Sequence, residues 1–115
     1  MITLYGISNC DTVKKARKWL QQHGIDYRFH DLRSDGINEA LVNHWLAQLP
    51  LEQLVNRRST SWKQLDESVR QSLTADNAAA LCCQHPTLIK RPLLDNNGSL
   101  HSGFSEAGYH ALFLS

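Results

Sequence analysis

The chain has 115 residues, of which 42% are hydrophobic and 20% charged, which fits one globular domain with a single core and leaves little room for two. Twelve basic and eleven acidic side chains nearly cancel, so the chain lacks the basic excess of a general nucleic-acid-binding protein. No apolar run is long enough to span a bilayer, and residues 1–5 are interpreted as the start of a strand and not as a signal peptide. We therefore expect a cytoplasmic protein that binds no nucleic acid and no membrane, with a monomer as the default.

The first third of the chain predicts a βαβ unit. Residues 2–7 form a short, mostly apolar run, expected as a strand buried on both faces. Residues 11–23 follow helical periodicity, with His23 on the apolar face, and Gly24 is placed to end that helix. Apolar and polar side chains then alternate over residues 25–30, which is typical of a strand with one solvated face. The two strands of such a unit are parallel, and its crossover is right-handed.

The middle of the chain, residues 34–85, is expected to be a helical insert. Apolar side chains recur at helical spacing over residues 37–49 and again over residues 62–73. An Ala- and Leu-rich helix is expected over residues 74–84. The polar segment 54–59 separates the first two helices and is expected to be a loop or short turn.

The last part of the chain returns to strands. Residues 93–101 predict a β-hairpin, because Asn97–Gly98 is a strong turn signal. Ser105 is placed to cap a final short helix. This element order predicts an α/β domain in which residues 1–33 and 86–115 form the core around the insert.

Cys10 is the strongest candidate for a reactive group. It lies in the turn of residues 8–12, where the first strand ends and the helix begins, and open α/β sheets bind ligands at that edge. A thiol reacts as its thiolate, which the partial positive charge of a helix N-terminus favours. Lys14 and Lys15 add favourable charge, and Asp11 opposes it. The alternative is a small side chain packed in a turn.

The spacing around Cys10 excludes two related chemistries. A dithiol of the thioredoxin type needs a second cysteine where the chain has Val13, and a Cys-x5-Arg phosphatase loop needs an arginine where it has Ala16. Cys82 and Cys83 lie in an apolar helix, where core packing is favoured over a resolving role. Their side chains diverge by roughly 100° on a helix, and we predict no metal site. An external thiol therefore has to complete any disulfide cycle, unless Cys82 or Cys83 comes near.

Two arginine segments are candidate anion sites. Guanidinium groups bind oxyanions in a bidentate manner, and Arg57 and Arg58 lie together in a polar loop. Arg91 precedes Pro92, which opens the hairpin and is tolerated there in the trans or the cis form. For all three arginines the alternative is an ordinary solvated charge.

Three segments together carry a resemblance to a known family. Residues 5–16 resemble the cysteine segment of the arsenate reductases that use glutathione, and more closely that of the YffB branch. Residues 85–93 resemble the second signature of that family, and residues 56–59 its middle arginine loop. The resemblance covers essentially the whole chain. It implies a thioredoxin-like fold with βαβ and ββα units and an inserted helical subdomain.

The resemblance also implies roles for individual residues. Cys10 would be the nucleophile, and Pro92 would be a cis proline facing it. Arg91 and one of Arg57 or Arg58 would bind an oxyanion or the carboxylates of glutathione, and the register of the loop favours Arg58. Three further residues are expected to assist at this site: Asn9, Thr12 and Lys14. Glutathione would be a co-substrate, and no tightly bound cofactor is expected.

The chain departs from the arsenate reductases at two points. They carry a third arginine where residues 101–105 have none, and a histidine before the cysteine loop where this chain has residues 6–8 without one. We therefore expect a thiol oxidoreductase that uses glutathione or another small thiol and acts on an oxidised substrate other than arsenate. The alternative is a non-catalytic, Spx-like regulatory or binding protein on the same fold. Such proteins typically carry a Cys-x-x-Cys switch, which is absent here.

Overall fold

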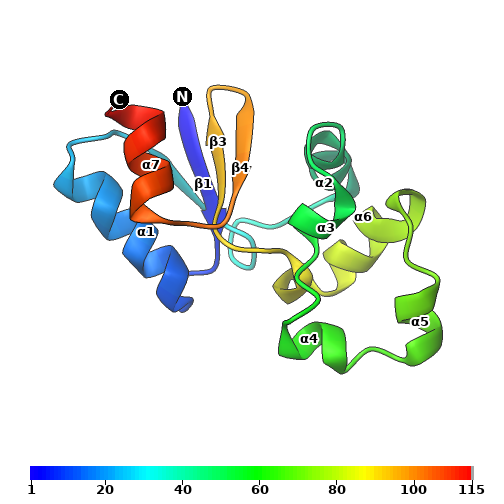
Figure 1. The fold of residues 1–115 in the computed structure, drawn as a ribbon. Helices are drawn as coiled ribbons and strands as arrows, with labels where there is room; N and C mark the ends of the chain where they lie inside the picture. The colour runs from blue at the N-terminus through cyan, green and yellow to red at the C-terminus, as the bar shows by residue number, and fades with distance from the viewer. Residues whose placement is uncertain (115) are drawn as a thin grey trace. The chain divides into compact units, whose positions relative to one another are not determined.

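The computed structural model describes residues 1–114, and its chain divides into two compact units (Figure 1). The first, which we call the core unit, is made of Met1–Asp35 and the chain from Arg91 onward. The second, which we call the helical unit, is Gly36–Lys90. No helix within residues 1–114 combines the length and the apolar character that a membrane crossing requires.

The core unit is built on a four-stranded sheet in the order β2-β1-β3-β4. Its strands are β1 (Ile2–Gly6), β2 (Arg28–Asp31), β3 (Leu93–Asn96) and β4 (Ser99–Ser102). The parallel pairing of β1 with β2 confirms the predicted βαβ unit, and β3 and β4 form the predicted hairpin. β1 also pairs antiparallel with β3, so the N-terminal strand and the first strand after the helical unit lie side by side in the middle of the sheet. This mixed sheet with its βαβ and ββα units is a thioredoxin-like fold.

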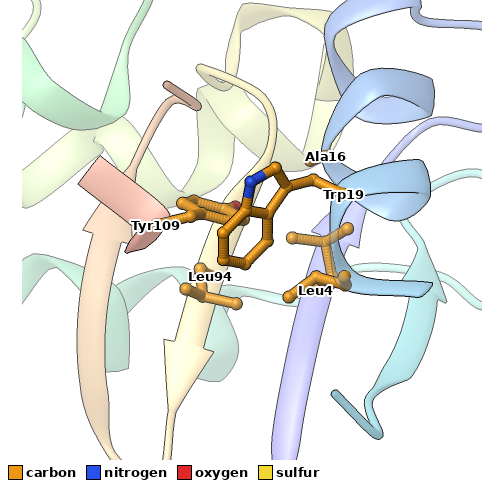
Figure 2. Close-up of a cluster of buried hydrophobic side chains, with 6 residues drawn as sticks. Leu4, Ala16, Trp19, Leu94 and Tyr109 are labelled. Atoms are coloured by element: carbon orange, nitrogen blue, oxygen red, sulfur yellow. The ribbon is translucent and has the colours of Figure 1, made fainter. Parts of the chain in front are cut away.

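Two helices, α1 (Asp11–Gln22) and α7 (Glu106–Phe113), cover one face of this sheet. Their side chains form a buried cluster with one leucine from each central strand. Leu20 of α1 belongs to it, and Figure 2 labels its other members: Leu4, Ala16, Trp19, Leu94 and Tyr109. The indole of Trp19 meets the ring of Tyr109 edge to face, with the ring centroids 5.6 Å apart. Burying each large apolar side chain contributes about 1.5–3 kcal/mol, so this cluster is a main source of stability for the core unit.

Helix α1 begins and ends near the predicted residues. Gly24 follows the helix with a φ of +66°, the left-handed conformation that favours glycine after a helix C-terminus. Its buried face includes Trp19, which the sequence pattern did not single out. His23, the C-cap residue of α1, is on the predicted face, since its ring stacks on Trp19 with the centroids 4.0 Å apart. Its side chain is nevertheless exposed.

The predicted hairpin is confirmed in its details. Asn97 and Gly98 both have positive φ, at 54° and 99°, as a type I′ turn requires. The N–H of Gly98 donates to the carboxylate of Asp95 at 2.7 Å. After the hairpin, the Ser105 hydroxyl oxygen accepts the N–H of Gly108 at 3.0 Å and caps α7, as predicted.

The two N-terminal strands differ from expectation in burial and in length. The prediction that β1 is buried on both faces is wrong: Leu4 is buried, but Tyr5 on the other face is partly exposed. The second strand begins only at Arg28, although alternation starts at residue 25. Ile25 and Tyr27 pack against the core cluster from outside the strand, which explains why they are apolar.

The helical unit contains more and shorter helices than the sequence pattern predicts. They are α2 (Glu39–Leu46), α3 (Leu51–Leu54), α4 (Thr60–Lys63), α5 (Glu67–Gln71), α6 (Ala75–Gln84) and the 3₁₀ turn η1 (Pro86–Leu88). The prediction of one helix over residues 62–73 is wrong, because the backbone at Asp66 is extended and separates α4 from α5. Neither of these helices has a buried residue, so no apolar face holds them in one continuous helix.

Helix α6 is the predicted Ala- and Leu-rich helix. Its N-terminus carries a capping box, in which Thr74 and Asn77 bond each other's backbone N–H groups. Ala78 and Cys82 are buried on α6, as are Val42 and Trp45 on α2. These residues form the core of the helical unit.

Candidate functional site

Cys10 occupies the N-cap position of α1, at the carboxyl end of β1. Its N–H donates to the carbonyl of Ile7 at 3.1 Å, and its carbonyl accepts the N–H of Lys14 at 3.0 Å. The thiol is half-buried and unoxidised, and the side chain makes no capping hydrogen bond to the helix. The thiol therefore stands at the N-terminus of a twelve-residue helix, where the backbone N–H groups of the first turn have no partner within the helix.

A buried carboxylate fixes the loop that leads to Cys10. Asp31, at the end of β2, is only 8% exposed. Its side-chain oxygens accept backbone N–H groups from Ser8 at 3.2 Å, Arg33 at 2.8 Å and Ser34 at 3.1 Å. The bond to Ser8 joins two loops that are 23 residues apart in the chain. Asp31 thus holds the segment two residues before the thiol against the end of the neighbouring strand.

The same hydrogen bonds determine the charge state of Asp31. Burial raises the pKa of its carboxyl, but the N–H donors of Arg33, Ser34 and Ser8 outweigh burial and bring the pKa below its ordinary value. The sequence analysis missed this residue. An aspartate that accepts N–H groups two and three residues ahead is a common local turn motif, but the bond to Ser8 has no local signal.

Close packing of α1 on β1 also positions the thiol. A Cβ at Gly6 would lie 2.8 Å from a γ-methyl carbon of Val13, closer than carbon atoms approach one another. Val13 is fully buried and occupies the position of the second cysteine of a dithiol motif. Glycine in the last position of β1 therefore allows the first turn of α1, and with it Cys10, to lie directly against the strand.

Arg91 and Pro92 lie at the same edge of the sheet as Cys10. The peptide bond between them is cis. Leu93 pairs with Tyr5, so the register brings Pro92 beside Gly6, from which the chain continues to the cysteine loop. The carbonyl of Pro92 accepts the N–H of Gly103 at 2.9 Å, which anchors it to the segment after β4. Pro92 is buried and Arg91 is half-buried.

The other predicted residues of the core unit lie around the start of α1. Asn9, Thr12 and Lys14 are all exposed. The structure thus brings six of the candidates into one unit, at or near one edge of the sheet, and leaves two arginines in the helical unit. Within residues 1–114, no group of three or more His, Cys, Asp or Glu side chains is arranged to hold a metal ion.

The two arginines of the helical unit lie in an ordered loop. The side-chain oxygen of Asn56 accepts the N–H of Arg58 at 3.0 Å, and the Ser59 hydroxyl oxygen accepts the N–H of Trp62 at 3.1 Å. Both arginines are exposed. The guanidinium of Arg57 lies over the ring of Trp62, 5.5 Å from its centroid. Arg57 is therefore engaged with an aromatic ring of its own unit.

The two remaining cysteines have a different character. Burial, reinforced by the neighbouring Cys83, raises the pKa of the Cys82 thiol to about 12. Burial and the carboxylate of Glu39 raise the pKa of Cys83. Both cysteines belong to α6, and Cys82 lies in the core of the helical unit. Such thiols form little thiolate at neutral pH and are poorly suited to resolve a disulfide.

Known proteins resemble this chain in sequence and in fold. The model of the ArsC family matches residues 5–112. A solved YffB protein is 38% identical, with a TM-score of 0.91 over 96% of this chain and 97% of its own. An arsenate reductase-related protein of Brucella melitensis is 45% identical, with a TM-score of 0.79 over 99% and 95% of the two chains. An uncharacterized protein of Haemophilus influenzae is 47% identical over 98% of this chain and 99% of its own.

More distant relatives include a global transcriptional regulator. The Spx protein of Lactiplantibacillus plantarum is 26% identical over 92% of this chain and 81% of its own. The fold is therefore shared by proteins of more than one function, and similarity alone does not choose between them. The family match spans nearly the whole chain and includes Cys10, Arg91 and Pro92, and the chain belongs to the ArsC family.

Proposed function

We propose that this chain is a thiol oxidoreductase that uses glutathione as its co-substrate and Cys10 as its single nucleophile. The observation that carries the proposal is the position of Cys10. Its half-buried thiol makes no capping hydrogen bond and stands at the N-cap position of a twelve-residue helix, at the carboxyl edge of the sheet. The ArsC family match and the likeness to a YffB protein support it. The cytoplasm, where glutathione keeps thiols reduced, is the proposed location.

The proposed cycle needs one cysteine of the protein. The Cys10 thiolate attacks the glutathione sulfur of a substrate mixed disulfide, a Cys10–glutathione disulfide forms, and the substrate leaves as a thiolate. A second glutathione thiolate then attacks the glutathione sulfur of this intermediate. Oxidised glutathione leaves and the Cys10 thiolate returns. In the net reaction, the substrate–glutathione disulfide and one glutathione thiol give the substrate thiol and oxidised glutathione, so one disulfide bond is exchanged for another.

The neighbouring residues have distinct parts in this proposal. The first turn of α1 stabilises the thiolate, both before attack and when it leaves. Arg91 binds a carboxylate of glutathione, and Asn9, Thr12 and Lys14 assist at the start of the helix. Arg58 is proposed as a second anion-binding residue on the resemblance of its loop to the family, and Arg57 is the less suitable of the pair because of its contact with Trp62.

Mass spectrometry after incubation with oxidised glutathione tests the proposal. The wild type should gain one glutathione, which peptide mapping should place at Cys10. Cys10→Ser should gain none, and the matched control Cys83→Ser should behave as the wild type. Reduced glutathione should then remove the adduct. A wild type that stays unmodified, or a Cys10→Ser variant that is modified equally well, would contradict the proposal.

A regulatory or binding role without turnover is the second candidate, and the likeness to Spx regulators favours it. The buried Val13 at the position of the second cysteine speaks against a redox switch of the dithiol type. The two candidates differ in one property that can be measured directly. An adaptor needs no reactive thiol, so a Cys10 that is slow toward every disulfide would favour the binding role.

A further inference from the structure

A continuous groove runs along the surface of the core unit between α1 and α7. One cavity of about 630 Å³ has Lys15 and Lys18 on its α1 side and Phe104 and Glu106 at the start of α7. A second cavity of about 380 Å³ continues it toward His23 and His110. The two cavities share three lining residues, Trp19, Gln22 and Glu106, and therefore form one groove. We call it the α1–α7 groove.

One end of this groove lies at the first turn of α1. Thr12 lines it there and follows Cys10, the N-cap residue of the helix, by two positions in the chain. The lining residues of α1 extend from Thr12 to His23, which at the rise of an α-helix is a length of about 16 Å. An extended peptide of about five residues covers that distance. The groove is thus longer than a ligand confined to the thiol itself would need.

The charges of the groove favour an acidic occupant. The exposed side chains of Lys15 and Lys18 line its wide end, where Glu106 is the one carboxylate among the described lining residues. Two histidines line the narrow end and add no negative charge. Phe104, which is partly exposed, adds apolar surface to the larger cavity, and the largely buried Trp19 lines both cavities. An occupant that carries carboxylates together with an apolar side chain matches this surface.

We propose that the α1–α7 groove binds an extended acidic segment of a protein substrate and so brings the glutathione disulfide on a neighbouring substrate cysteine to Cys10. The inference rests on the proposed function, because it presupposes that Cys10 reacts with a disulfide. It adds the class of substrate: a protein in which the reacting cysteine is flanked by acidic and apolar residues. The lysines would act chiefly on the rate of encounter, and the groove would hold the segment during exchange.

The test uses the full chain with Cys83→Ser, so that Cys10 is the accessible thiol. Two acidic peptides of five residues each contain one cysteine, two glutamates and two phenylalanines, and the cysteine is activated as a 2-pyridyl disulfide. The cysteine is the first residue in one peptide and the last in the other, so that both orientations in the groove are tested. Matched peptides replace the glutamates with lysines. The Cys10 thiolate attacks the peptide sulfur and releases pyridine-2-thione, whose absorbance gives the rate. A neutral dipyridyl disulfide measures the reactivity of Cys10 itself, and all peptide rates are divided by it.

The acidic peptide that reacts faster should do so about five-fold faster than the basic peptide of the same orientation. This factor is the effect expected of two exposed ion pairs, between the two glutamates of the peptide and Lys15 and Lys18. The double variant Lys15→Glu/Lys18→Glu should remove or reverse this preference, and Glu106→Gln should increase it. Lys63→Glu makes the same kind of charge change on α4 of the helical unit and should leave the preference unchanged.

Two results would overturn the inference while the neutral reagent still reacts rapidly at Cys10. They are equal rates for acidic and basic peptides, and a preference for the acidic peptide that survives the double variant. If the neutral reagent itself fails to react at Cys10, the proposed function fails, and the inference fails with it.

Discussion

The carboxylate of Asp31 accepts the N–H of Ser8 across the gap between the ends of β2 and β1, at 3.2 Å. This bond connects two loops that are otherwise joined by the N–H of Leu32 donating to the carbonyl of Gly6 at 2.8 Å. Ser8 is followed by Asn9 and then by the thiol. The position of Cys10 at the helix terminus therefore depends on a charged group that belongs to a different strand.

Removal of this carboxylate should destabilise the core unit. Asp31→Ala leaves three N–H groups without their acceptor, and we expect the free energy of unfolding to fall by about 2–3 kcal/mol, as for lost hydrogen bonds to a charged group. Denaturation in urea measures the change. Asp26→Ala, at an exposed aspartate, is the control and should stay within about 0.5 kcal/mol of the wild type. If the free energy of unfolding fell equally in the two variants, the three hydrogen bonds to Asp31 would not contribute to stability.

The stability should also depend on pH through this residue. Because the pKa of Asp31 is lower in the folded than in the unfolded state, its contribution is complete above the unfolded value of about 3.9 and is lost as the pH falls through the folded value. Urea midpoints measured from pH 6 downward should fall more steeply for the wild type than for Asp31→Asn below about pH 4. Parallel curves would contradict a lowered pKa.

The close contact between Gly6 and Val13 should appear as energetic coupling. Gly6→Ala alone should destabilise the protein by about 1–3 kcal/mol, because the new methyl group overlaps the valine. In the double variant Gly6→Ala/Val13→Ala that overlap is relieved. The double variant should therefore lose less stability than the sum of the two single variants, a difference that a double-mutant cycle in urea detects. Simple additivity would mean that the backbone moves to accommodate the methyl group.

The three thiols should differ widely in their rate of alkylation. With iodoacetamide near pH 8, we expect Cys10 to react first and Cys83 more slowly, because burial and Glu39 raise the pKa of Cys83. Cys82 is fully buried and its pKa is raised to about 12, so it should react only when the protein unfolds. Peptide mapping over time gives the order, and addition of urea should make the three rates similar. Early modification of Cys82 in the native protein would contradict its burial.

Local signals explain which elements could be predicted from the sequence. The hairpin follows from Asn97–Gly98, because few residues tolerate two consecutive positive φ angles. The start of α1 follows from the change in periodicity, which in turn places Cys10 at a helix N-terminus. The caps at Ser105 and Gly24 are equally local. Cys10 could be predicted as a candidate because the strand end and the helix start that mark its position both lie within a few residues of it.

Other features depend on contacts between distant parts of the chain. Leu65 and Val69 repeat at helical spacing, yet the chain turns at Asp66 because α4 and α5 have no buried face to unite them. The role of Asp31 becomes visible only when Ser8 lies beside it. The groove along α1 depends on where α7 packs, which no periodicity within either helix reveals.

The strand order has a further consequence for the behaviour of the protein at high concentration. The two strands at the edges of the sheet, β2 and β4, are each only four residues long, and the strands that carry the fully buried leucines lie in the middle. Ser99 on β4 and Arg28 on β2 are exposed and polar. Short, polar edges are poor templates for adding a strand from another molecule. The sheet should therefore resist edge-to-edge aggregation.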